Sequence, residues 1–122
     1  MKSETVAILG ASDNPERYSH KAFILLRENG HKVIPVNPSG KIIEGIPAAQ
    51  SPGDITEPVD TLTMYVSPGI SSKLTDAILA LKPRRIIFNP GTENPELQQK
   101  CAAQGMEVIE ACTLVMLRTG QF

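Results

Sequence analysis

Short apolar runs alternate along this chain with segments whose apolar residues recur at helical spacing. The runs are typical of strands buried on both faces, and strands alternating with helices predict a parallel sheet with right-handed crossovers. We therefore expect an α/β fold, a single Rossmann-like doubly wound parallel sheet of about five strands in the order 3-2-1-4-5. The expected strands are residues 6–9, 31–37, 60–66, 85–88 and 106–110, and the expected helices are residues 18–28, 70–81, 94–104 and 111–117.

The stretch from Lys41 to Pro58 has glycines and prolines too closely spaced for a long element. Its few isoleucines predict an ordered flap rather than a disordered linker. The chain has 122 residues, with no internal repeat and no sign of a second domain. Residues 1–122 are thus expected to form one domain.

Composition excludes several classes of function. A formal net charge of −1 gives no field to attract nucleic acid or an anionic membrane, and 4% aromatic residues provide few stacking platforms. No apolar run approaches the roughly 20 residues that span a bilayer. No signal-peptide pattern precedes the first strand, so we expect a cytoplasmic location.

The first strand ends at a turn that suits a phosphate. Gly10, Ala11 and Ser12 follow the apolar run directly, and a helical pattern starts near Tyr18. Glycine lets the backbone bend and approach a ligand closely, and the free N–H groups at a helix start attract an anion. Residues 6–20 are therefore predicted to cradle a phosphate.

The other strand exits share this chemistry. Ligands of doubly wound sheets bind outside the carboxyl ends of the strands, and four of these exits carry glycine or proline beside small hydroxyl or amide side chains. Asn37 stands where NAD enzymes usually place an acidic residue that binds the ribose, and Lys41 follows it. A neutral side chain with a nearby cation suits a phosphorylated ribose, and Ser12 replaces the second glycine of the dinucleotide fingerprint.

The titratable residues provide no catalytic set. His20, near the first helix start, either binds a ligand phosphate or covers the surface, whereas His31 is expected to be solvated. Cys101 and Cys112 lack metal-type spacing and are interpreted as reduced thiols that are at least partly buried. We therefore expect no catalytic residue and no metal ligand, which favours a binding protein over an enzyme.

Three segments of the sequence resemble those of one known family. They are Val6–Pro15, Val33–Pro38 and Ile86–Gly91. Together they resemble the small stand-alone CoA-binding protein family, which is related to the N-terminal nucleotide-binding domain of the succinyl-CoA synthetase alpha subunit. The resemblance covers residues 4–117.

The resemblance implies that coenzyme A or an acyl-CoA is the ligand, and it implies a place for each part. Gly10, Ala11 and Ser12 would line the diphosphate or adenosine. The ribose with its 3′-phosphate would meet Asn37, Pro38 and Lys41. The remaining implied contacts are Val66, Ser67 and Pro68 for the adenine, and Asn89, Pro90 and Gly91 for the pantetheine arm.

Two features depart from the family pattern. The ending 110–122 is less basic than the family's, and Asp13 and Glu16 place two acids in the phosphate turn. The phosphorylated histidine of the synthetase lies in a further domain, so no synthetase activity is implied.

The leading hypothesis is non-catalytic binding of CoA or acyl-CoA. The alternatives are an NAD(P)-binding enzyme or redox sensor, with Lys41 at the NADP 2′-phosphate, and a protein-interaction module with a vestigial groove. A homodimer through residues 111–117 is conceivable, whereas the sequence indicates no protein partner.

Overall fold

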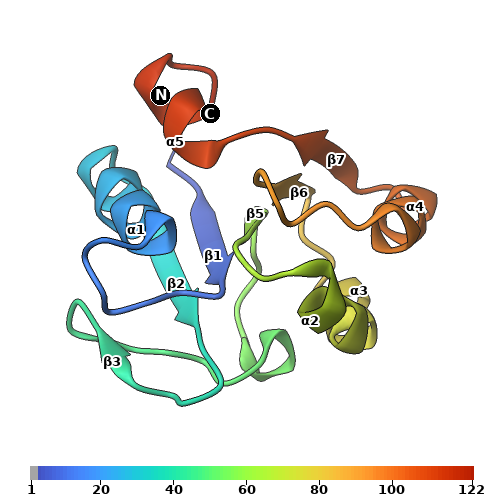
Figure 1. The fold of residues 1–122 in the computed structure, drawn as a ribbon, viewed down its shortest axis with the longest axis horizontal. Helices are drawn as coiled ribbons and strands as arrows, with labels where there is room; N and C mark the ends of the chain where they lie inside the picture. The colour runs from blue at the N-terminus through green and yellow to red at the C-terminus, as the bar shows by residue number, and fades with distance from the viewer. Residues whose placement is uncertain (1–2) are drawn as a thin grey trace.

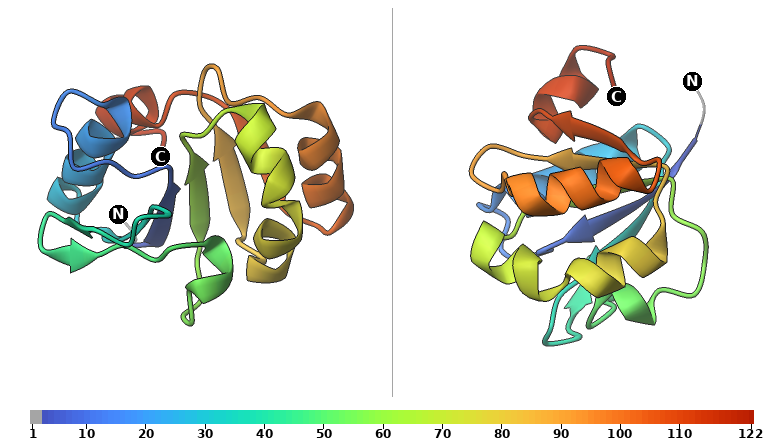
Figure 2. Two further views of the ribbon diagram at one scale, coloured as in Figure 1. Left: turned by 60° about the horizontal axis from the view of Figure 1, so that its bottom comes forward. Right: turned by 90° about the vertical axis from the view of Figure 1, so that its right-hand side faces the viewer.

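In the computed structural model, which describes residues 3–122, five parallel strands form one sheet with helices on both faces (Figures 1 and 2). This confirms the predicted α/β class and the Rossmann-like parallel sheet. The elements are β1 (Thr5–Leu9), α1 (Tyr18–Glu28), β2 (Lys32–Val36), β3 (Ile42–Ile43), β4 (Ile46–Pro47), the 3₁₀ turn η1 (Pro52–Asp54), β5 (Thr61–Met64), α2 (Pro68–Lys73), α3 (Thr75–Leu81), β6 (Arg85–Phe88), α4 (Pro95–Ala103), β7 (Glu107–Glu110) and α5 (Thr113–Arg118).

The strands lie in the order β2-β1-β5-β6-β7. The expected neighbours β2–β1 and β6–β7 are present. The difference concerns β5, which is the third strand of this sheet along the chain. The order 3-2-1-4-5 places this third strand outside β2, whereas β5 lies between β1 and β6 and pairs with both. Pro35 explains why β2 is an edge strand, because proline has no N–H to donate to a second neighbour. The outer side of β2 is covered only near its end by Ala49, whose N–H donates to Pro35 O at 2.9 Å.

Both faces of the sheet are buried, and β1 supplies side chains to each in alternation. Val6 and Ile8 pack with the α1 side chains, whereas Ala7 and Leu9 pack with α3 and α4. All four are at most 3% exposed, which accounts for the unbroken apolar run in the sequence. Figure 2 shows α1 and α5 on one side of the sheet and α2 to α4 on the other.

Two segments differ in detail from the sequence prediction. The helix expected over residues 70–81 is two helices, α2 and α3, which meet at Leu74. The flap over residues 41–58 contains the β3–β4 hairpin, whose turn residues Glu44 and Gly45 have φ of 50° and 81°. Ile43 of this hairpin is fully buried against the α1 side of the core, so the flap is ordered, as expected.

His31 is buried, and the expectation that it is solvated was wrong. Its ring is 5% exposed and lies 5.1 Å from the Phe122 ring. Its Nδ1 accepts a hydrogen bond of 3.0 Å from the Glu4 N–H. A contact with the far end of the chain, which no local pattern reveals, therefore decides its environment.

No helix in residues 3–122 has the length and apolar character needed to cross a membrane.

Candidate functional site

The candidate site lies at the carboxyl ends of β1 and β5, where the helices that follow these two strands diverge to opposite faces of the sheet. Gly10 ends β1 with φ of 92°, and a Cβ at this position would lie 2.8 Å from Tyr65 O. Only glycine accommodates both the backbone angle and this close approach. The two strand exits therefore touch, and they form the floor of a cavity of about 490 Å³ that is lined by Gly10, Ala11, Ser12, Glu16, Arg17, Tyr18, Ser19, Asn37 and Tyr65.

The turn after β1 lines this cavity through Gly10, Ala11 and Ser12. Ser12 Oγ accepts from the Asn14 N–H at 3.0 Å, and Asn14 Oδ1 accepts from the Glu16 N–H at 3.0 Å, so the turn is held by its own side chains. Helix α1 begins at Tyr18 without a side-chain cap and without an acidic residue in its first turn. The positive end of the helix is thus open toward the cavity, as expected for an anion site.

Asn37 connects the first and second strand exits. Its Nδ2 donates to Ala11 O at 2.8 Å, and its Oδ1 accepts from the Ser39 N–H and hydroxyl at 2.9 and 2.7 Å. The backbone supports this junction, because the N–H groups of Gly10 and Ala11 both donate to Val36 O. Asn37 therefore shapes the wall of the cavity with hydrogen bonds that are already made.

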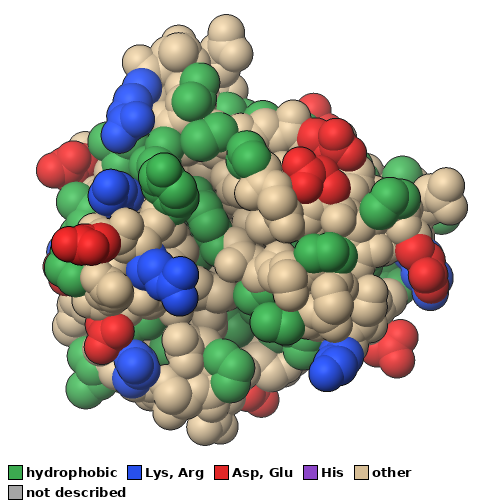
Figure 3. Space-filling model, viewed as in Figure 1, with side chains coloured by type: hydrophobic (Ala, Val, Ile, Leu, Met, Phe, Trp, Pro, Cys, Tyr) green, Lys and Arg blue, Asp and Glu red, His purple; other side chains and the backbone are tan. Residues whose placement is uncertain are grey.

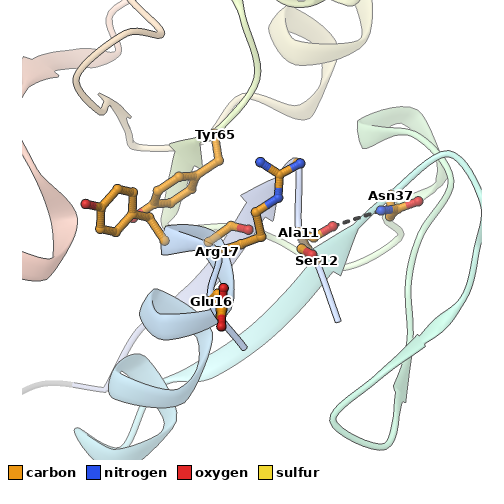
Figure 4. Close-up of a pocket in the computed structure, with 9 residues that line it drawn as sticks. Ala11, Ser12, Glu16, Arg17, Asn37 and Tyr65 are labelled. Atoms are coloured by element: carbon orange, nitrogen blue, oxygen red, sulfur yellow. Dashed lines mark hydrogen bonds between the residues drawn. The ribbon is translucent and has the colours of Figure 1, made fainter. Parts of the chain in front are cut away.

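Arg17 supplies the cavity with a cation. No carboxylate in residues 3–122 lies within ion-pair distance of its guanidinium, although Glu16 also lines the cavity. Figure 4 shows the Arg17 side chain extending over Ala11 and Ser12, beside Tyr65. Lys41, the cation expected from the sequence, is absent from the lining, and its Nζ lies 3.7 Å from Asp13 Oδ1.

A second, more apolar cavity of about 350 Å³ adjoins the first. Tyr18 and Tyr65 line both cavities, so their side chains form a shared wall. Burial raises the pKa of Tyr65 to about 12, and its hydroxyl lies near Thr63 and Thr113 without a well-formed hydrogen bond to either. The phenol is therefore neutral at physiological pH. The full lining is Tyr18, Tyr65, Asn89, Pro90, Cys112, Leu114 and Arg118.

Asn89 holds the exits of β5 and β6 and the start of α5 together. Its Nδ2 donates to Thr63 Oγ1 at 2.8 Å and to Met64 O at 2.7 Å, and its Oδ1 accepts from the Thr113 N–H at 2.8 Å. The side chain is 2% exposed. It positions the wall of the apolar cavity and has no free donor for a ligand.

The structure brings some of the sequence-predicted residues together and leaves others outside. Gly10, Ala11, Ser12 and Asn37 line the first cavity, and Asn89 and Pro90 line the second. Pro38, Lys41, Val66, Ser67, Pro68 and Gly91 belong to the same strand exits but line neither cavity.

Sequence reasoning missed several lining residues. Arg17 and Tyr18 could have been found as the residues just before and at the helix start, and Tyr65 as a residue at the end of a strand. Leu114 and Arg118 had no local signal, because α5 reaches the cavity only through tertiary packing. The missed residues are Arg17, Tyr18, Ser19, Tyr65, Cys112, Leu114 and Arg118.

The remaining titratable groups have structural contacts. His20 is 7% exposed, and its Nε2 lies 3.1 Å from Glu44 Oε2 in the β3–β4 hairpin. Both cysteines are free; Cys101 is buried and Cys112 is partly exposed, as the sequence predicted. In the described part of the chain, no three histidine, cysteine or acidic side chains are grouped to hold a metal ion.

Comparison with known proteins gives one family and close structural relatives. The sequence model of the CoA binding domain family matches residues 4–118. A Bacillus subtilis (strain 168) protein, uncharacterized protein YneT, is 28% identical over 114 residues, 88% of this chain and 80% of YneT. A crystal structure of an uncharacterized protein superposes with a TM-score of 0.94 at 38% identity and covers 100% of both chains.

A larger enzyme contains the same fold. The dinucleotide-forming acetyl-coenzyme A synthetase 1 of Ca. Korarchaeum cryptofilum, in complex with phosphate and ADP, superposes with a TM-score of 0.74 at 20% identity. The match covers 88% of this chain but only 25% of the synthetase chain. At this identity the likeness shows a shared fold and nothing about activity.

Proposed function

Because the chain belongs to the CoA binding domain family, we propose that it binds coenzyme A or an acyl-CoA and carries out no reaction on it. The proposal assigns the diphosphate to the first cavity, against the turn of Gly10, Ala11 and Ser12. It assigns the ribose to the second strand exit, near Asn37 and Lys41. The pantetheine arm then enters the apolar cavity.

The observation that carries the proposal is the unpaired Arg17 above an open helix start. The guanidinium and the uncapped start of α1, at Tyr18 and Ser19, line one cavity, and guanidinium groups and helix N-termini both bind phosphate oxygens well. Hydrogen bonds to a charged group are worth roughly 1.5–3 kcal/mol each. A diphosphate uses both kinds of donor at once.

The apolar cavity supports an extended ligand rather than a bare nucleotide. It adjoins the first cavity at Tyr18 and Tyr65, which line both, and Pro90, Cys112 and Leu114 supply apolar surface. A pantetheine arm is a flexible, largely uncharged chain that suits such a wall. The side chains that line the two cavities include no nucleophile–base pair, which supports binding without catalysis.

Titration calorimetry with CoA, acetyl-CoA and NADPH tests the proposal. We expect the two CoA ligands to bind and NADPH to bind more weakly. Arg17→Ala should weaken CoA binding roughly 10- to 100-fold, because it removes a charge-assisted contact to the diphosphate. Arg84→Ala is the matched control, since Arg84 precedes β6 at the opposite end of the sheet and pairs with Glu4 at 3.0 Å.

Each outcome bears on the proposal directly. Unchanged CoA affinity in the Arg17 variant, or an equal loss in the Arg84 variant, would contradict the assigned diphosphate site. Tighter binding of NADPH than of CoA would favour the dinucleotide alternative. Release of any product from CoA thioesters by the wild-type protein would contradict a purely binding role.

A further inference from the structure

The cation at the second strand exit already has a partner. Lys41 Nζ lies 3.7 Å from Asp13 Oδ1, and the two side chains are 45% and 56% exposed. Asp13 follows Ser12, which lines the first cavity, and Asn37 ties the two turns together through Ala11 O. The ion pair thus borders the cavity where the second exit meets the phosphate turn.

We propose that Asp13 sets the ligand specificity of this site by neutralising Lys41. With Lys41 paired, a 3′-phosphate on the ribose adds little to binding, so the protein takes CoA and dephospho-CoA, or their thioesters, with similar affinity. This inference rests on the proposed function, because it takes the nucleotide ribose to lie at the second exit. The recognised group is then the diphosphate that both ligands share.

Electrostatics support this assignment. A phosphate monoester carries about −1.5 to −2 charges at pH 7, so it is attracted by Lys41 and repelled by Asp13. Because the two groups lie close together and are similarly exposed, their effects on a nearby phosphate largely cancel. A phosphate near this pair therefore meets a local dipole rather than a positive charge.

Arg17 differs from Lys41 in having no ion-pair partner, so we expect Arg17 to supply most of the affinity for the diphosphate. No ion pair within residues 3–122 involves the Arg17 guanidinium, so its full charge is available to the diphosphate. Basic and acidic side chains also lie side by side on the α1 side of the face in Figure 3, with no broad basic surface to attract a further phosphate. Lys41 is the cation that the proposed function places near the ribose, so we expect discrimination by the 3′-phosphate to depend on it.

The test measures the ratio of the dissociation constants of dephospho-CoA and CoA by calorimetry on the full chain. In the wild type we expect the two constants to agree within about threefold, since an exposed, compensated charge contributes little. Asp13→Asn should improve CoA binding about fivefold more than dephospho-CoA binding, because it frees Lys41 for the 3′-phosphate. Adding Lys41→Met to this variant should return the ratio to its wild-type value.

Glu16→Gln is the matched control. It also replaces a carboxylate of the first turn with an amide, but Glu16 does not pair with Lys41, so it should change binding of both ligands by the same factor. A wild-type preference for CoA above tenfold, or an unchanged ratio in Asp13→Asn, overturns this inference and leaves the proposed function intact. Failure of the folded wild type to bind either ligand overturns the proposed function itself.

Discussion

At the residue scale, the environment of some side chains is set by contacts with residues that lie far away in the sequence. His31 is buried because it accepts from the Glu4 N–H and packs on Phe122, and both partners lie far from it along the chain. Tyr65 is set between two cavities by the close approach of Gly10 to its backbone. Such environments depend on the fold, so the sequence alone predicts neither.

Tyr65 gives a testable dependence of stability on pH. Burial raises the pKa of its phenol from the ordinary value of 10.0 to about 12, so the folded chain keeps a proton that the unfolded chain loses above pH 10. Stability should therefore fall as the pH rises from 10 to 12, by about 1.4 kcal/mol at pH 11. Urea unfolding at pH 8 and pH 11 measures the loss.

Two variants isolate this contribution. Tyr65→Phe should remove it, whereas Tyr18→Phe should retain it, because Tyr18 is 69% exposed. An alkaline loss of stability that is the same in wild type and Tyr65→Phe would show that other groups cause it.

At the element scale, the positions of the strands were predictable and their order was not. Apolar runs such as Ile86–Phe88 identify strands because both faces of the sheet are buried, and the strand that contains this run, Arg85–Phe88, has the predicted bounds. The partner of each strand is a tertiary property. Pro35 was the one local signal, since it favours an edge position for β2, and it argues for the observed order. The β3–β4 hairpin is too short for its pattern to be recognised.

Asn89 joins three elements, and its removal should be costly. Asn89→Ala leaves the Thr113 N–H and Met64 O without this partner in a buried setting, and each such loss costs about 1–3 kcal/mol. We expect a loss of roughly 2–4 kcal/mol in the free energy of unfolding, measured by urea denaturation. Asn14→Ala, an exposed asparagine with one local hydrogen bond, should cost less than about 1 kcal/mol. Equal effects of the two variants would contradict the joining role of Asn89.

At the scale of the whole molecule, the sheet gathers at one edge residues that are dispersed along the chain. The first cavity comes from the exits of β1, β2 and β5 and the start of α1, and the second adds the exit of β6 and α5. The sequence predicted the glycine turn and the amide-bearing exits, because their residue types have local causes. It could not predict that α5 closes the far wall, since this depends on packing against α1.

Because Tyr18 and Tyr65 line both cavities, we predict that a ligand bound across them protects Cys112. An acyl-CoA bound as proposed extends from the phosphate turn past Tyr18 and Tyr65, and it covers the Cys112 thiol in the apolar cavity. Acetyl-CoA is the suitable ligand, because its sulfur is blocked and does not react with the label. At about 100 Kd, alkylation of Cys112 by a maleimide should slow at least tenfold, since only about 1% of the protein remains free.

The chain and the ligand each provide a control for this measurement. Cys101 is fully buried in the core, and burial raises the pKa of its thiol, so it should react slowly with or without ligand. Adenosine 3′-phosphate 5′-diphosphate keeps the diphosphate but lacks the pantetheine arm, so it should bind and leave Cys112 reactive. Protection of Cys112 by this nucleotide as well would indicate a general closure of the fold. Rapid labelling of Cys112 at saturating acetyl-CoA would place the pantetheine outside the apolar cavity.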